Sequence, residues 1–321
     1  VALQTENAQI NRSRRVDLRS GAENPDRSNL QELADQARSF YQDNAGHTKA
    51  AEARQLEVFT LIQLEAEGDQ TVGDRLEQAV NAAVSDQSIP EKIRAKIVAA
   101  RAFTEETGKA TNRAQYFAAV ERVSRQLIKD YPTQPQAYQA MLAVARVSDD
   151  AKRAAYAQEI VDAEAPSELK QAAQLILDRA ALVGRPLTEA LGESADKYLE
   201  GIPAGNPVIV FSWATWGSGS IELGRMVQAR GFDALGICLD NDIEAAQKAQ
   251  QDANLGGQHV YDEKGPKGDL VSQLKFSTAG QIYLIDKEGV IRDVRGGHDL
   301  ENKLSNLEFK TPVLQEPALS L

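Results

Sequence analysis

The residues best placed to do chemistry form a turn between a predicted strand and a predicted helix. An apolar, β-branched run over 207–212 predicts the strand, and residues 221–227 predict the helix. Between them lie two tryptophans and a glycine-serine turn, namely Trp213, Trp216, Gly217, Ser218, Gly219 and Ser220. A cysteine at such a turn would be activated, because the helix N-terminus lowers the pKa of a thiol there. No cysteine is present in this turn, so we expect no disulfide exchange at it.

The serines of this turn allow two other interpretations. A serine hydroxyl is a weak nucleophile unless a general base lies beside it, and no nucleophile-elbow motif surrounds residues 217–220. If the turn opens a helix, its free backbone N–H groups and hydroxyls would form a cradle for an anion or a peptide carboxylate. The simpler interpretation, which we favour, is that Ser220 caps the helix.

The other reactive side chains are few and scattered. Cys238 is the only cysteine and lies in the apolar run 234–239, so we expect it in the core with a raised pKa. His47, His259 and His298 are the only histidines, and they do not cluster at the spacing of metal ligands. We therefore expect no metal and no cofactor. His298 could face the turn, although a surface position is the simpler interpretation.

The second half of the chain predicts alternating strands and helices. The expected strands are 207–212, 234–240, 258–261, 281–286 and 290–295, and the expected helices are 219–230, 243–254, 267–275 and 299–307. Gly289 would supply the turn of the closing hairpin, because glycine tolerates a positive φ. A βαβ unit followed by a β-hairpin and a final helix is typical of the thioredoxin arrangement.

From about Gly184 onward the chain resembles the TlpA/ResA type of bacterial thioredoxin-like thiol-disulfide reductases, a family related to the AhpC/TSA superfamily. The matching features are a Gly-x-Pro motif at Gly184, the aromatic run that ends at Trp216, a strand with an acidic end at 235–242 and a hairpin at 282–291. The resemblance covers well over a third of the chain. It implies a thioredoxin-like fold for this part.

The chain departs from that family at both halves of the family's redox site. The family carries Cys-x-x-Cys where this chain has residues 217–220, and a cis-proline where this chain has Gly280. A cis peptide bond is essentially a property of proline. The loss of both features indicates abandoned redox chemistry. We group Gly280 with the two tryptophans and the turn as a degenerate redox site that could bind a ligand.

The first half of the chain predicts helices. Apolar residues repeat there at helical spacing, as at Leu30, Leu33, Ala34, Ala37 and Phe40. Helix-breaking residues recur at 43–46, 86–90, 130–132 and 163–166. We interpret this pattern as irregular helix-turn-helix units that resemble tetratricopeptide-like repeats without their strict consensus. A compact, non-repetitive helical bundle is the alternative.

The expected fold class is an α-helical domain of tetratricopeptide-like hairpins followed by an α/β, thioredoxin-like domain. The expected boundaries are a flexible segment at 1–24, the helical domain at 25–183, the thioredoxin-like domain at 184–308 and an extended tail at 309–321. The chain starts at Val1 rather than at Met. We expect a leader to have been removed.

Composition limits the classes of partner. The 321 residues carry a net charge of −11, which argues against a nucleic-acid partner, because phosphate-binding surfaces need clustered Lys and Arg. The hydrophobic content of 42% is sufficient for a core in each of two domains. No apolar run is long enough to span a membrane.

These observations favour a non-catalytic adaptor or scaffold. In this interpretation the helical half offers a surface to a protein partner, whose identity the sequence does not give, and the thioredoxin-like half is a rigid docking module. The family resemblance alone implies a periplasmic or cell-envelope location in a bacterium. The alternative is an oxidoreductase of the same family that works through Cys238 or through a thiol supplied by another molecule.

Overall fold

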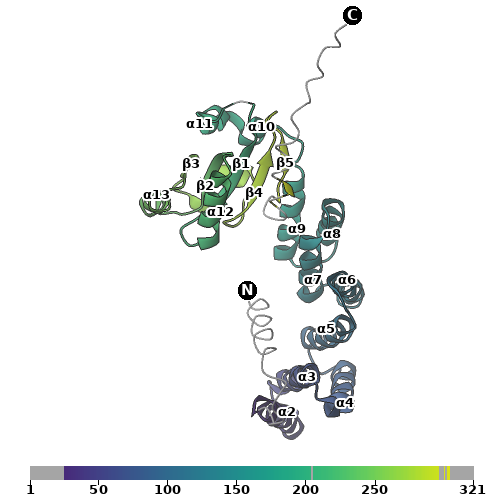
Figure 1. Cartoon of the computed structure of the whole chain (residues 1–321). Helices are drawn as coiled ribbons and strands as arrows, with labels where there is room; N and C mark the ends of the chain where they lie inside the picture. The colour runs from purple at the N-terminus through teal and green to yellow at the C-terminus, as the bar shows by residue number, and fades with distance from the viewer. Residues whose placement is uncertain (1–24, 204, 296–299, 301, 304–321) are drawn as a thin grey trace, which may run out of the picture. The chain divides into compact units, whose positions relative to one another are not determined.

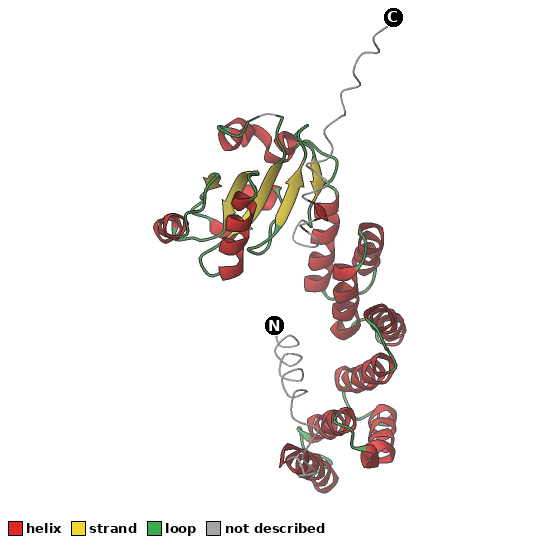
Figure 2. Ribbon diagram, in the orientation of Figure 1, coloured by secondary structure: helices red, strands yellow, loops and turns green. Residues whose placement is uncertain are grey.

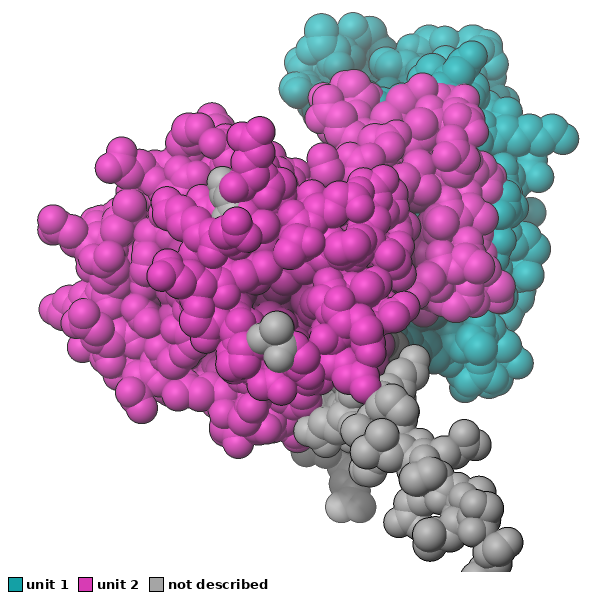
Figure 3. Space-filling view, turned by 90° about the horizontal axis from the view of Figure 1, so that it is seen from above, with its two compact units in different colours: residues 1–144, 164–166 teal, residues 145–163, 167–321 magenta. Residues whose placement is uncertain are grey.

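The computed structural model describes residues 25–203, 205–295, 300, 302 and 303. These residues fall into two compact units, shown in Figure 3. The first contains the chain up to residue 144 together with 164–166, and the second contains 145–163 and the chain from residue 167 onward. The domain boundary expected at residue 184 lies inside the second unit and stays a prediction. The expected segment 1–24, the tail at 309–321, His298 and most of the expected helix at 299–307 lie outside the described residues.

The first unit consists of helices joined by short turns, as Figure 1 shows. The helices are α2 (Pro25–Asp43), α3 (Ala50–Ala66), α4 (Gly73–Ser85), α5 (Glu91–Gly108), α6 (Arg113–Asp130) and α7 (Pro135–Val147), with a short 3₁₀ turn η1 (Gln70–Val72) before α4. The last residues of α7 belong to the second unit. The predicted breaks at 43–46, 86–90 and 130–132 all separate successive helices, so these predictions are confirmed. The tetratricopeptide-like repeat stays a prediction.

Capping side chains explain why several of these helices start where they do. Asn112 precedes α6 and accepts a hydrogen bond from the Gln115 N–H at 2.9 Å. Asp69 precedes η1 and accepts from the Thr71 N–H at 3.0 Å. Such caps satisfy N–H groups that have no partner inside the helix. The breaks near residues 69 and 112 were not among those predicted.

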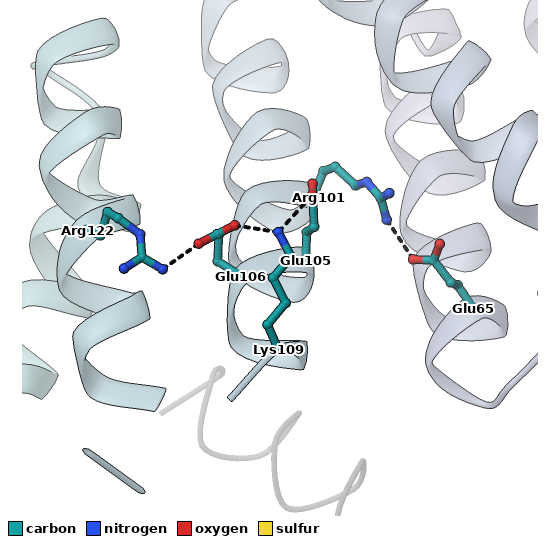
Figure 4. Close-up of polar contacts among 6 residues, drawn as sticks. All are labelled: Glu65, Arg101, Glu105, Glu106, Lys109 and Arg122. Atoms are coloured by element: carbon teal, nitrogen blue, oxygen red, sulfur yellow. Dashed lines mark hydrogen bonds and ion pairs between the residues drawn. The ribbon is translucent and has the colours of Figure 1, made fainter. Parts of the chain in front are cut away.

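Ion pairs join three helices of the first unit along one edge, as Figure 4 shows. Arg101 of α5 reaches Glu65 of α3 at 2.6 Å, and Arg122 of α6 reaches Glu106 of α5 at 2.5 Å. Lys109 contacts Glu106 at 2.7 Å, so Glu106 pairs with a lysine at the end of its own helix as well as with the arginine of α6. Pairs near the surface contribute little individually to stability.

The second unit begins with a helix pair, α8 (Asp150–Asp162) and α9 (Ser167–Ala180), which pack against each other. The predicted break at 163–166 separates them and is confirmed. Two short helices follow, α10 (Leu187–Leu191) and α11 (Ala195–Leu199), with a 3₁₀ turn η2 (Gly192–Ser194) between them. The sequence did not predict these short helices.

A five-stranded sheet forms the centre of the second unit, as Figure 2 shows. In chain order its elements are β1 (Val208–Trp213), α12 (Ser218–Ala229), β2 (Asp233–Cys238), α13 (Ile243–Asp252), β3 (Gln258–Val260), η3 (Gly265–Lys267), α14 (Asp269–Gln273), β4 (Ile282–Ile285) and β5 (Ile291–Asp293). All five strands and three of the four helices therefore lie where the sequence predicts them.

The strand order is β3-β2-β1-β4-β5, with β1, β2 and β3 parallel and with β4 antiparallel to β1 and to β5. This is a βαβ unit followed by a β-hairpin, as the sequence predicts for a thioredoxin-like fold. The Gly184 motif pairs with β5 through the N–H of Gly184 and the carbonyl of Ile291, at 2.8 Å. A single bridge from Pro186 to Val290 extends this pairing.

Apolar layers cover both faces of the sheet. One layer joins Val210, Tyr283 and Ile285 to residues of α10, α11 and α14, including Leu191 and Leu270. The other joins Phe211, Trp213 and Leu284 to α12 and α13, through Val227 and Ala246. All six residues of β1 are buried, which is why five of them are apolar instead of alternating with polar residues, and the buried hydroxyl of Ser212 is hydrogen-bonded.

Within the described ranges, none of the helices combines the length and the apolar character needed to cross a bilayer.

Candidate functional site

The turn predicted as the centre of the site connects a strand to a helix. β1 ends at Trp213 and α12 begins at Ser218, so residues 214–217 form the turn. Gly217 is the N-cap residue of α12, and no side chain caps the helix. The expectation that Ser220 caps α12 is therefore wrong.

Ser220 points into the turn instead. Its Oγ donates a hydrogen bond to the Gly217 carbonyl at 2.5 Å and accepts one from the Ala214 N–H at 3.2 Å. The residue is only 3% exposed. The Ser220 hydroxyl donates its proton to a backbone carbonyl of the turn, and no described general base contacts it. The hydroxyl therefore stabilises the backbone of the turn and is not available as a nucleophile.

The residues around Gly280 form the opposite wall of the site. Gly280 has a φ of 85°, which a side chain would strain, and its N–H donates to the Ser212 carbonyl at 2.7 Å. A Cβ built on Gly280 would lie 4.0 Å from the Cβ of Ser220, so the two positions face each other. No cis peptide bond occurs among the described residues, including those of the loop that contains Gly280.

An open pocket of about 560 Å³ lies between these walls. It is lined by Trp216, Gly217, Gly219, Ser220, Leu223, Thr278, Ala279 and Gly280. None of these described lining residues has an ionisable side chain. Trp216 is 61% exposed, which is unusual for an indole, since large aromatic side chains are mostly buried in folded proteins. The pocket thus offers an aromatic surface and backbone polar groups, and it lacks an acid or a base.

Sequence reasoning identified most of the residues of this pocket and missed three. Leu223, Thr278 and Ala279 were not singled out. Leu223 follows Ser220 by one helical turn, and the other two precede Gly280 directly, so helical spacing and adjacency to the predicted residues could have indicated them.

Trp213 does not line the pocket. It is fully buried in the apolar layer under α12 and α13. Its ring makes an edge contact with His259 at 5.4 Å between centroids and another with Tyr261 at 6.0 Å. Trp213 and Trp216 therefore lie in opposite environments, because a residue that continues the strand faces the core whereas one in the turn reaches solvent.

Cys238 lies in the core, as the sequence predicts. It is 2% exposed, and burial raises the pKa of its thiol to about 12. Its Sγ lies 3.6 Å from Oδ2 of Asp240, whose carboxylate also accepts from the Thr215 N–H at 2.7 Å. A buried thiol beside a carboxylate is almost never ionised at neutral pH, so Cys238 is a poor nucleophile in the folded protein.

His259 and His47 do not join the site. His259 is partly buried beside β2, and burial lowers the pKa of its imidazole. Its Nε2 lies 3.1 Å from the Gly256 carbonyl. His47 lies in the other unit, where it contacts the edge of Phe40. In the part of the chain that the structure describes, no group of His, Cys, Asp or Glu side chains could hold a metal ion.

Comparisons with known proteins give likenesses for the sheet-containing part. No family model matches this chain, and no curated protein matches it. A C-terminal domain from Bacteroides thetaiotaomicron, provisionally described as part of a thiol-disulfide oxidoreductase, is 20% identical over 34% of this chain and 81% of its own, with a TM-score of 0.31. A thiol-disulfide oxidoreductase from Bacteroides fragilis is 26% identical over 32% of this chain and 82% of its own, with a TM-score of 0.29.

A third solved structure, from Bacteroides vulgatus and with the same provisional description, is 16% identical over 32% of this chain and 70% of its own, with a TM-score of 0.27. Scores this low carry no argument about function. We therefore base the thioredoxin-like fold class on the strand order and not on these neighbours.

Proposed function

We propose that this protein is a protein-binding adaptor or scaffold that performs no disulfide exchange. The supporting observation is the pocket at the turn, where an exposed indole lies beside Leu223 and Ala279 and where the Ser220 hydroxyl is committed to the backbone. Acid-base or nucleophilic catalysis needs a titratable or activated group within reach of the substrate. Binding needs only shape, an apolar surface and hydrogen-bonding groups, and the pocket has these.

An exposed tryptophan suits contact with another polypeptide. Tryptophan residues dominate the free energy of many protein interfaces, because the ring buries a large apolar area and loses little conformational entropy. Gly219 lines the pocket without a side chain, and a Cβ built there would meet no atom within 4 Å, so a second chain could approach the backbone at this position. We expect the partner to place an apolar side chain against Trp216.

The helical hairpins of the first unit provide a second candidate surface. Leu33, Leu56, Phe59 and Tyr116 are large apolar side chains that remain more than a third exposed on α2, α3 and α6. Ion pairs link α3 to α5 and α5 to α6. We propose that these hairpins act as a tetratricopeptide-like scaffold for a protein partner, and that the protein works in the bacterial cell envelope, as the resemblance to the TlpA/ResA type implies.

The absence of redox activity is tested directly. Insulin reduction driven by dithiothreitol should proceed at the uncatalysed rate with this protein, and Cys238→Ser should not change that rate. Turnover above the uncatalysed rate that disappears in Cys238→Ser would overturn the adaptor proposal in favour of a reductase.

The binding role is tested by partner capture with matched variants. The full chain, Trp216→Ala and Tyr116→Ala are each used to capture proteins from an envelope extract. Both substitutions remove an exposed aromatic ring, and Tyr116 lies on α6 in the other unit. For a protein that binds the pocket, we expect capture to be lost with Trp216→Ala and kept with Tyr116→Ala, which alters only the second candidate surface. A partner lost only with Tyr116→Ala would move the binding surface to the helices, and identical capture by all three would contradict the role of the pocket.

A further inference from the structure

The wall of the pocket opposite the turn belongs to a loop, residues 275–281, whose inner side is fixed by side chains. Ser212 at the end of β1 is fully buried, and its Oγ donates to the Thr278 carbonyl at 2.7 Å and accepts from the Gln281 N–H at 3.0 Å. Oε1 of Gln281 accepts from the N–H groups of Ser277 at 2.7 Å and of Thr278 at 3.2 Å. The shape of this loop therefore depends on how the Gln281 amide is oriented.

Arg179 reaches the same loop from the last turn of α9. Its Nε donates to the Lys275 carbonyl at 2.7 Å, and its Nη2 donates to Ser277 Oγ at 2.6 Å and to Gln281 Oε1 at 3.3 Å. The residue is only 8% exposed. All three acceptors are uncharged, so the contact is a geometric fit and not an ion pair. A guanidinium carries its N–H donors on three nitrogens in a rigid plane and can satisfy three such acceptors at once. A lysine ammonium carries all its donors on one nitrogen and cannot reproduce this arrangement.

The first residue of the loop is held in a conformation that needs such support. Lys275 has a φ of 58°, in the left-handed region that residues with a Cβ rarely adopt. Conformations of this kind persist when the surroundings determine them. The hydrogen bond from Arg179 to the Lys275 carbonyl is one such determinant.

A second arginine fixes the helix pair α8–α9 to the sheet. Arg295 follows β5, and its Nη1 donates to the Ser148 carbonyl at 2.8 Å and to Asp150 Oδ1 at 2.9 Å. Its Nη2 donates to the Arg146 carbonyl at 3.0 Å. The start of α8 is thus tied to the end of β5, while the end of α9 is tied to the loop of the pocket. The first turn of α8 and the last turn of α9 are both held by contacts inside the second unit.

We infer that Arg179 is a positioning residue for the pocket, so that the docking of α9 sets the position of Thr278, Ala279 and Gly280 against the turn. The inference deepens the proposed function and rests on it for its consequence in binding. Any ligand that prefers the pocket with this wall in place must favour the docked position of α9, and docking must favour the ligand by the same factor. The helix pair α8–α9 of the second unit then controls the pocket next to the sheet.

The test uses amide hydrogen exchange on the ligand-free full chain. The variants are Arg179→Met, which keeps the length but removes the donors, and Arg179→Lys, which keeps the charge but not the fork. We expect the Ser277 and Thr278 amides to exchange about tenfold faster or more in both variants, because charge-assisted hydrogen bonds that orient Gln281 are lost. The amides of β4 should keep their rates.

The matched control is Ile176→Val, which trims a buried side chain on the same helix and lowers stability while leaving the donors of Arg179 in place. Loop exchange in the Arg179 variants that is no faster than in Ile176→Val would overturn the inference. Should both Arg179 variants fail to fold, Ser277→Ala removes one acceptor alone and should still accelerate exchange at Thr278. Unchanged exchange there would overturn the inference equally.

This outcome is separable from that of the adaptor proposal, since the exchange experiment needs no partner. If Trp216→Ala loses a captured protein, Arg179→Lys should weaken the same capture and Ile176→Val should not. Fast loop exchange together with undiminished capture by Arg179→Lys would contradict the coupling while leaving the adaptor role in place.

Discussion

At the scale of single residues, the turn keeps a geometry in which two sulfurs would fit. A Cβ placed on Gly217 would lie 3.0 Å from Ser220 Oγ. That spacing is close to the separation between the Cβ of one half-cystine and the sulfur of the other, about 3 Å for an S–S bond near 2.05 Å. The spacing at this turn is therefore compatible with a disulfide bond between positions 217 and 220.

This geometry predicts that two substitutions restore a disulfide. In the double variant Gly217→Cys, Ser220→Cys, air oxidation should close a bond, although Ala279 Cβ, 3.0 Å from the new Cβ, must shift by a few tenths of an ångström. Thiol titration of the unfolded protein measures the result. Only the thiol of Cys238 should be free in the double variant, whereas Gly217→Cys alone should show the new thiol as well. Full thiol content in the oxidised double variant would mean that the turn is no longer shaped for this bond.

At the scale of helices and strands, a buried carboxylate connects three helices of the first unit. Glu57 of α3 is 1% exposed and accepts from the Tyr41 hydroxyl of α2 at 2.6 Å and from Arg75 Nε of α4 at 3.0 Å. Burial, with the hydrogen bond to Glu57 as the next cause, raises the pKa of Tyr41 to about 12. Arg75 also pairs with Asp35 of α2 at 2.5 Å. Glu57 of α3 therefore forms hydrogen bonds with both α2 and α4.

Removing this carboxylate should loosen the helix packing. We expect Glu57→Ala to lower the free energy of unfolding by about 2–3 kcal/mol, because it leaves the Arg75 guanidinium and the Tyr41 hydroxyl without their buried acceptor. Asp35→Asn is the matched control, since Asp35 pairs with the same arginine but its side chain is 66% exposed, and the expected loss is below about 1 kcal/mol. Urea unfolding followed by circular dichroism measures both. Equal losses in the two variants would show that burial of Glu57 is not what matters.

How much of these elements the sequence predicts depends on how local their causes are. The five strands are predicted because β-branched runs and turn residues act within a few positions. Helix breaks at Gly- and Pro-containing turns are predicted for the same reason, whereas α10 and α11 are too short to show a periodic pattern. In the site, the resemblance to the TlpA/ResA type placed Trp216 and Gly280, because the redox turn and the cis-proline of that family match these positions in the sequence. The inward orientation of Ser220 and the contact of Arg179 with residues about a hundred positions away depend on packing, which no local pattern encodes.

At the scale of the whole molecule, the two units hold different kinds of titratable group. In the first unit, hydrogen bonds from the Thr71 side chain and backbone hold the pKa of Asp69 below its usual value, and those from Ser88 do the same for Asp86. In the second unit, hydrogen bonds from the Val290 N–H and Arg292 outweigh burial and lower the pKa of Asp286. Among the described residues, the second unit also holds a partly buried histidine, His259, whereas His47 of the first unit is exposed.

This difference predicts that acid destabilises the second unit first. Burial lowers the pKa of His259, so its neutral form stabilises the fold above the unfolded pKa, near 6.5, and this stabilisation is lost as pH falls through the lower folded value. The carboxylates lose their contribution only below the usual pKa of Asp, near 3.9, as pH falls through their depressed folded values. Between about pH 6.5 and pH 4, the second unit should therefore lose stability while the first unit does not.

Tryptophan fluorescence distinguishes the two units, because both tryptophans lie in the second and Trp213 contacts His259 directly. Thermal unfolding followed by fluorescence should shift to lower temperature between pH 6.5 and pH 5. Helices of both units contribute to the far-ultraviolet signal, so the part of that signal that does not move with the fluorescence should shift only below about pH 4. His259→Gln should remove the early shift in fluorescence, and Asp86→Asn should reduce only the later one. A fluorescence transition that keeps its midpoint down to pH 4.5 in the unsubstituted protein would show that His259 is not held neutral by its burial beside the sheet.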